Sequence, residues 1–172
     1  PAQVELVANG NDTLFAIDKT TGKQRWQVHR SPALGMEVAG YAGPAYDHGR
    51  VYMAFSDGTV TAYDPQDGTE RWTPVDLAAD AERVAGETPK YLDVDTTPVF
   101  DDMRPGVRGV FVASYVGGVN ALDGESGTRL WANDQVTGVT DLLLWREPAH
   151  VPNADGPYAG GPNVPERRIL VA

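Results

Sequence analysis

The chain contains no cysteine among its 172 residues, and this absence excludes two kinds of structure. Neither a disulfide framework nor a zinc site with cysteine ligands can form without thiols. Histidine is scarce as well, and no two of His29, His48 and His150 are four residues apart. No serine stands in a Gly-x-Ser-x-Gly motif, the turn that exposes the nucleophile of many hydrolases. We therefore expect no catalytic residue, no metal and no cofactor in this chain.

Basic residues are few, with 14 Lys and Arg against 24 Asp and Glu, so that the net charge is −10. Proteins that bind nucleic acids or an anionic membrane surface need clustered positive charge. The apolar runs also fall far short of the roughly 18 residues that a membrane-spanning helix requires. The composition predicts a soluble protein whose partners are neither nucleic acid nor a lipid surface.

Glycine and proline are frequent, at 19 and 13 residues. Their combined share lies above the usual value but below that of disordered sequences, so a globular fold with many tight turns is expected. The chain begins at Pro1 without a basic segment followed by an apolar one. We expect any signal peptide to lie outside the sequence shown.

One pattern, Ala-x-Asp-x-x-x-Gly-x-x-x-Trp or a close variant of it, occurs three times, with Gly four residues and Trp eight residues after Asp. The three copies are Asp18, Gly22 and Trp26, then Asp64, Gly68 and Trp72, then Asp123, Gly127 and Trp131. Such regular spacing predicts one repeated supersecondary unit.

The residue types of the repeat indicate a β-hairpin. Each repeat follows an alternating segment such as 59–63, whose period of two predicts a strand with one buried face. The Asp can accept hydrogen bonds from backbone N–H groups two or three residues on, and the Gly supplies the positive φ of a tight turn. We interpret the tryptophans as packing residues between units, not as a cofactor platform. The Asp residues are interpreted as turn caps, because the alternating oxygen ligands of a calcium loop are missing.

Two further strands precede each of the last two hairpins, at 43–46 and 51–55 and again at 97–100 and 110–114. Four antiparallel strands per unit predict the blade of a β-propeller. The expected fold is all-β, a partial β-propeller of four-stranded antiparallel blades in a single domain, with two complete and two partial blades. Its predicted parts are blade I at 1–30, blade II at 41–75, an insertion at 76–92, blade III at 93–135 and the start of blade IV at 136–172.

Segments outside the repeats give four further expectations. Apolar positions over 76–87 predict one short helix, with Asp76 as its N-cap and Gly86 as its stop. The stretch 148–165 is rich in Pro, Gly and Asn and is expected to be a long surface loop. Residues 4–8 and 169–172 are expected to be second strands of the two partial blades, so that the sequence shown stops within a blade.

The repeat resembles that of the quinoprotein-like β-propellers, a family named for quinone-dependent dehydrogenases that also includes many non-catalytic members. A second likeness covers about thirty residues, at 92–99, 109–115 and 121–123. These segments resemble one blade of the BamB family, the lipoproteins of the machine that inserts β-barrels into the bacterial outer membrane.

The resemblance implies a periplasmic scaffold without enzymatic activity or cofactor, attached to the outer membrane by a lipid anchor outside this segment. It implies that the partner is BamA, the barrel-inserting subunit, and that Asp93 and Asp95 face this partner. A neighbouring loop would add Met36, Val38 and Ala39. This sequence departs from the family there, because Ala39 stands at a basic position and Glu37 adds an acid.

Asp93 and Asp95 also stand out without the resemblance. Alternate residues of an extended segment share a face, so both carboxylates point the same way. Like charges on one face repel unless solvent or a cationic partner relieves them. An acidic partner-binding edge is one interpretation, and a pair of turn caps is the other. For the whole chain the alternatives to a scaffold are a quinone-dependent dehydrogenase propeller, whose vicinal cysteine pair is missing from this sequence, or the extracytoplasmic sensor of a signalling protein.

Overall fold

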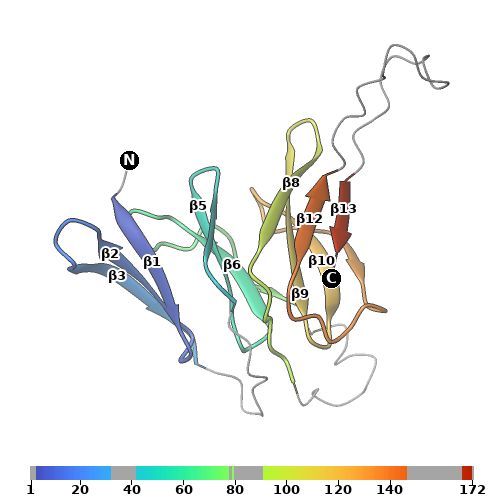
Figure 1. The fold of residues 1–172 in the computed structure, drawn as a ribbon, viewed down its shortest axis with the longest axis horizontal. Helices are drawn as coiled ribbons and strands as arrows, with labels where there is room; N and C mark the ends of the chain where they lie inside the picture. The colour runs from blue at the N-terminus through green and yellow to red at the C-terminus, as the bar shows by residue number, and fades with distance from the viewer. Residues whose placement is uncertain (1–2, 32–41, 78, 80–90, 147–167, 172) are drawn as a thin grey trace, which may run out of the picture.

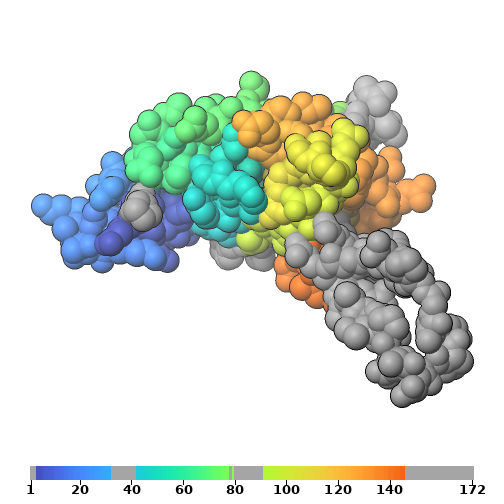
Figure 2. Space-filling view, turned by 90° about the horizontal axis from the view of Figure 1, so that it is seen from above, coloured from blue at the N-terminus to red at the C-terminus, as the bar shows by residue number. Residues whose placement is uncertain are grey.

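The computed structural model describes residues 3–31, 42–77, 79, 91–146 and 168–171. All the secondary-structure elements assigned in these residues are β-strands, and all strand pairs are antiparallel. The sheets stand side by side in chain order (Figure 1), and the view from above shows the same succession (Figure 2). The predicted all-β fold, a partial β-propeller, is confirmed.

The described strands form three sheets and one pair. The first sheet holds β1 (Val4–Asn9), β2 (Thr13–Asp18) and β3 (Gln24–His29). The second holds β4 (Ala45–Asp47), β5 (Arg50–Ala54), β6 (Thr59–Tyr63) and β7 (Val75–Asp76). The third holds β8 (Val99–Arg104), β9 (Val107–Ser114), β10 (Gly118–Asp123) and β11 (Arg129–Asn133). The remaining pair is β12 (Leu143–Arg146) with β13 (Arg168–Val171).

The core lies between neighbouring sheets, and β5 shows how. Its successive side chains point to opposite faces, as in any strand. Val51 and Met53 pack in one buried cluster with Leu14 of the first sheet. Tyr52 packs in another cluster with Val110 of the third sheet. The middle sheet is thus buried on both faces, and each such side chain contributes about 1.5–3 kcal/mol by leaving water.

The returning strand of the second hairpin is shorter than the repeat predicts. Only the bridge between Tyr63 and Glu70 and the two residues of β7 pair with β6 or its end, so that Trp72 lies outside a strand. Pro74 provides the physical reason, because proline has no N–H to donate to a neighbouring strand. The hydroxyl of Thr61 donates to the Trp72 carbonyl at 2.9 Å and holds the segment against the sheet.

The short helix expected over 76–87 lies largely outside the described residues. At its predicted start, the backbone N–H of Ala79 donates to Asp76 Oδ1 at 3.0 Å, the bond that an N-cap makes. The loop expected at 148–165 lies outside the described residues altogether. In the described part of the chain no helix has the length and apolar character needed to cross a membrane.

Candidate partner-binding site at the sheet junctions

The three repeated hairpins share one backbone geometry. In each of them the Gly N–H donates to the carbonyl of the Asp four residues earlier, at 2.8–2.9 Å. The Asp Oδ1 accepts from the N–H two residues on, at 2.7–3.0 Å. The glycines have φ of 69°, 76° and 74°, a region that side chains with a Cβ rarely enter. The sequence pattern therefore encodes three copies of one turn.

Two of the three hairpin glycines, Gly68 and Gly127, each lie against the tryptophan of the preceding sheet. A Cβ atom built on Gly68 would lie 2.9 Å from Cε3 of Trp26, and one on Gly127 would lie 2.5 Å from Cε3 of Trp72. Trp26 and Trp72 are each 8% exposed. We call this arrangement the Trp-on-Gly contact. It holds the first sheet to the second and the second to the third.

Asp93 and Asp95 lie where the second and third sheets meet. The N–H of Val94 donates to the carbonyl of Phe55, just after β5, at 3.3 Å. The N–H of Tyr115, just after β9, donates to the carbonyl of Asp93 at 3.0 Å. The segment 93–95 is therefore fixed by turns from both sheets.

The two carboxylates are buried, with Asp93 3% and Asp95 6% exposed. Burial, and then the nearby charge of Asp93, raise the pKa of Asp95 to about 6. Oδ2 of Asp95 is buried and has no hydrogen-bond partner. A buried carboxylate oxygen without a partner is costly, since ionised groups lose their hydration on burial. The site is therefore poised to accept a hydrogen bond or a positive charge.

The burial of both residues is a property that the sequence pattern did not predict. Sequence alternation indicates that the carboxylates share a side, but whether that side is covered depends on turns from two other parts of the chain. The second proposed contact loop, with Met36, Val38 and Ala39, lies outside the described residues.

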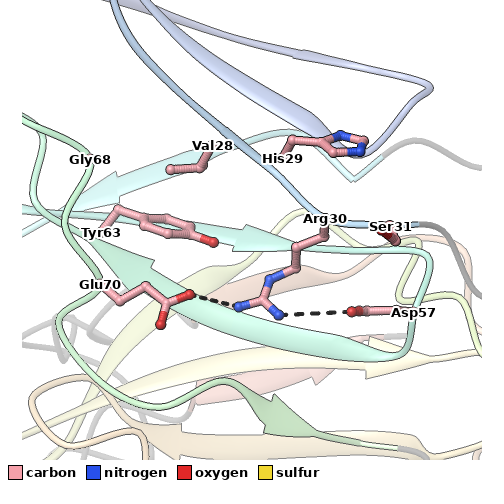
Figure 3. A pocket seen from close by; sticks show the side chains of 8 residues that line it. All are labelled: Val28, His29, Arg30, Ser31, Asp57, Tyr63, Gly68 and Glu70. Carbon is pink, nitrogen blue, oxygen red and sulfur yellow. Dashed lines mark hydrogen bonds and ion pairs between the residues drawn. The ribbon is translucent and has the colours of Figure 1, made fainter.

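The junction of the first and second sheets carries its own polar group. Arg30 Nη2 lies 2.8 Å from Glu70 Oε1, and Nη1 lies 3.9 Å from Asp57 Oδ2. These side chains line a pocket of about 540 Å³ together with His29, Ser31 and Tyr63 (Figure 3). Burial alone would lower the pKa of the Arg30 guanidinium, but Tyr63 and the two acids raise it above its ordinary value. Because Asp57 and Glu70 already neutralise the charge of Arg30, we interpret this pocket as a structural part of the junction between the two sheets.

Sequence reasoning missed one further residue of these junctions, Asp12. It has a φ of 48° and is 8% exposed. Its Oδ1 accepts from the N–H of Ser56 at 3.1 Å, and its Oδ2 accepts from the Ser56 hydroxyl. Asn11-Asp12 is a recognisable turn dipeptide. Its partner stands 44 residues away in another sheet, so no local signal identifies the contact.

Among the residues that the structure describes, no three His, Cys, Asp or Glu side chains are grouped as metal ligands would be.

Known proteins provide the remaining evidence. A sequence profile of the family described as "Outer membrane protein assembly factor BamB" matches residues 2–161. The assembly factor BamB of Yersinia pestis is 29% identical over 144 residues, which is 82% of this chain and 33% of that protein.

Solved structures share the fold. BamB from Moraxella catarrhalis superimposes with a TM-score of 0.63 at 24% identity, over 81% of this chain and 39% of that chain. A quinohemoprotein alcohol dehydrogenase from Comamonas testosteroni gives a TM-score of 0.55 at 22% identity, over 76% of this chain and 19% of that chain. At such identities these likenesses establish the fold alone.

The chain spans about a third of the length of its curated relative. Within that span the sequence repeats and the Trp-on-Gly contacts indicate propeller blades, and the family profile covers the same residues. Because the profile covers residues 2–161, the chain belongs to the BamB family.

Proposed function

We propose that this chain is part of a non-catalytic periplasmic scaffold, attached to the outer membrane, that assists the assembly and insertion of β-barrel proteins by binding a BamA-like subunit. The observation that carries the proposal is the family profile over residues 2–161, whose description names an outer membrane assembly factor. The relative from Yersinia pestis bears the same description.

The proposed contact with the partner is the pair Asp93 and Asp95. Its support is chemical, because Oδ2 of Asp95 is buried without a hydrogen-bond partner and a second carboxylate is close enough to raise the pKa of Asp95. A lysine or arginine from a partner would relieve both conditions at once, since charge-assisted hydrogen bonds to a carboxylate are among the strongest in proteins.

Because Asp93 and Asp95 are buried, we propose that they become accessible when the partner binds. The backbone of the segment 93–95 is hydrogen-bonded to the turns at Phe55 and Tyr115. We propose that the partner's cationic side chain enters there, while Met36, Val38 and Ala39 supply a neighbouring apolar contact. The net charge of −10 favours the approach of a basic partner surface at low salt.

The experiment compares two charge-matched double variants in calorimetric titrations with the soluble periplasmic domains of BamA from the same organism. Asp93→Asn with Asp95→Asn keeps the side-chain shape and removes both charges. Asp67→Asn with Asp134→Asn removes two charges from exposed positions. We expect at least a tenfold weaker affinity for the first variant, about 1.4 kcal/mol, and no change for the second.

A melting curve of each variant separates binding from folding. The proposal predicts that the Asp93 and Asp95 variant keeps or raises its melting temperature at pH 7 while it loses the partner. If this variant melts several degrees lower and binds as tightly as the wild type, the pair has a structural role and the proposed contact is wrong.

A further inference from the structure

A pair of tyrosines lies beside Asp93 and Asp95. The ring centroids of Tyr91 and Tyr115 are 5.5 Å apart and the ring planes are inclined by 64°, which is a T-shaped contact. Tyr91 precedes Asp93 by two residues, and the N–H of Tyr115 donates to the carbonyl of Asp93 at 3.0 Å. The two rings therefore come from the two segments of the chain that meet at Asp93.

The packing of Val94 indicates the side to which these groups belong. Val94 is 2% exposed and packs in the apolar cluster between the second and third sheets. Neighbouring side chains of an extended segment point to opposite faces. This alternation assigns Tyr91, Asp93 and Asp95 together to the face opposite Val94. Tyr115 belongs to the same face, because its ring contacts that of Tyr91.

Both tyrosines are only partly buried, whereas Tyr52 and Tyr63 of the core are 1% and 2% exposed. In a T-shaped pair, the ring that contributes its edge keeps both of its faces outside the contact. The face of a tyrosine ring carries partial negative charge and attracts a cation. A partly exposed aromatic pair beside two carboxylates thus has the chemistry of a site for an organic cation.

The state of Asp95 favours a guanidinium group over an ammonium group. Oδ2 of Asp95 is buried without a hydrogen-bond partner, and the residue is 6% exposed, so a cation that reaches it must leave water. A guanidinium is more weakly hydrated than an ammonium, and its parallel N–H groups can bind both oxygens of one carboxylate. Its plane can stack on an aromatic ring at the same time.

We propose that Tyr91 and Tyr115 select the cation that Asp93 and Asp95 accept, and that this cation is an arginine of the partner protein. The guanidinium lies against a tyrosine ring while its N–H groups donate to the carboxylates. This inference rests on the proposed function, because it takes Asp93 and Asp95 as the partner contact. It adds two residues to that contact and one side-chain type to the partner.

Calorimetric titration of this protein with the periplasmic domains of BamA from the same organism tests the role of the rings. Tyr115→Leu removes an aromatic face and should weaken binding about fivefold, whereas Tyr115→Phe keeps the face and should bind within about twofold of the wild type. Tyr91→Leu is a second, independent variant with the same expected loss. Tyr46→Leu is the matched control, because Tyr46 is 62% exposed in β4 and should leave the affinity unchanged. Melting curves establish that each variant is folded.

Replacing the surface arginines of the partner by lysine, one at a time, tests the identity of the cation. One replacement should weaken binding to the wild-type protein about fivefold, because an ammonium group cannot stack on the ring. The same replacement should make less than about a twofold difference to the binding of Tyr115→Leu, in which the selecting ring is absent. An equal loss with both proteins would show that Tyr115 does not contact this arginine and would overturn the inference.

The variant that combines Asp93→Asn with Asp95→Asn separates this inference from the proposed function. If that variant binds as tightly as the wild type, the proposed contact and this inference are both wrong. If it loses the partner while Tyr115→Leu and Tyr91→Leu bind like the wild type, the tyrosines do not select the cation. If no lysine replacement weakens the complex, the cation is not an arginine. Either of these last two results overturns this inference alone.

Discussion

Trp72 and Trp131 occupy the same position in two consecutive repeats, but only Trp72 is buried. Each tryptophan contacts one aromatic ring of its own sheet at a similar distance. The Trp72 ring centroid lies 6.4 Å from that of Tyr52, and the Trp131 centroid lies 5.9 Å from that of Phe111. The difference comes from the next hairpin, because Gly127 lies against Trp72 and no described glycine lies against Trp131. The tryptophan of a repeat is thus buried mainly by its contact with the next sheet, and less by its own sheet.

Replacing each tryptophan by alanine is the strongest test of this difference. Trp72→Ala should lower the free energy of unfolding by about 3–5 kcal/mol, because it empties a buried site between two sheets. Trp131→Ala should cost about 1 kcal/mol or less, because Trp131 is 37% exposed and is not enclosed between two described sheets. Urea unfolding curves followed by far-UV circular dichroism measure both. Equal costs would contradict the assignment of the packing energy to the junction.

Substitutions of the hairpin glycines test the same contact, because Gly127 lies against a tryptophan and Gly22 does not. Gly127→Asn places a Cβ where the Trp72 ring lies, and overpacking of this kind costs roughly 1–3 kcal/mol. Gly22→Asn meets open space and should cost no more than about 0.5 kcal/mol, because asparagine tolerates a positive φ. Urea unfolding curves measure the cost of both variants. A large loss at Gly22 would mean that the turn itself excludes any side chain.

Asp95 makes the junction of the second and third sheets sensitive to pH. Its pKa is raised in the folded state to about 6 from an ordinary 3.8, so the folded chain holds the proton more tightly than the unfolded chain does. The free energy of unfolding should therefore fall as pH rises from about 4 to about 6 and stay level above that. Asp95→Asn should remove this decline. A variant with the same pH profile as the wild type would assign the titration to another group.

Ion pairs between sheets should contribute more to the free energy of unfolding than ion pairs within a sheet. Arg108 donates to both oxygens of Asp47 across the second and third sheets, at 2.8 and 2.9 Å, and we expect Arg108→Met to cost about 1 kcal/mol. Lys19 and Glu5 form an exposed pair within the first sheet, and Lys19→Met should change stability by less than about 0.5 kcal/mol. Thermal unfolding at low salt measures the difference, and a reversed order would refute it.

The fold was predictable because its signals are local. The spacing of Asp64, Gly68 and Trp72 fixes a turn and a buried ring within nine residues, and three copies of it indicate a propeller. The strand 59–63 agrees with β6 at both ends. Where a local signal conflicts with the repeat, as at Pro74, the strand is broken.

The candidate site was less predictable because its properties depend on distant segments. Alternation indicates that Asp93 and Asp95 point the same way, but the turns to which their backbone is bonded, at Phe55 and Tyr115, belong to two other parts of the chain. The contact between Asp12 and Ser56 joins two sheets in the same manner. β12 was missed as a separate strand, although the apolar run at 142–145 is a signal for it.

A double-mutant cycle on Trp72 and Gly127 tests most directly that the Trp-on-Gly contact joins the sheets. The free energy of unfolding is measured for the wild type, Trp72→Ala, Gly127→Asn and the double variant. If the contact is as described, Gly127→Asn costs much less once the Trp72 ring is gone, and the coupling exceeds about 1 kcal/mol. Costs that add within about 0.5 kcal/mol would show that the two residues act independently and would contradict the account.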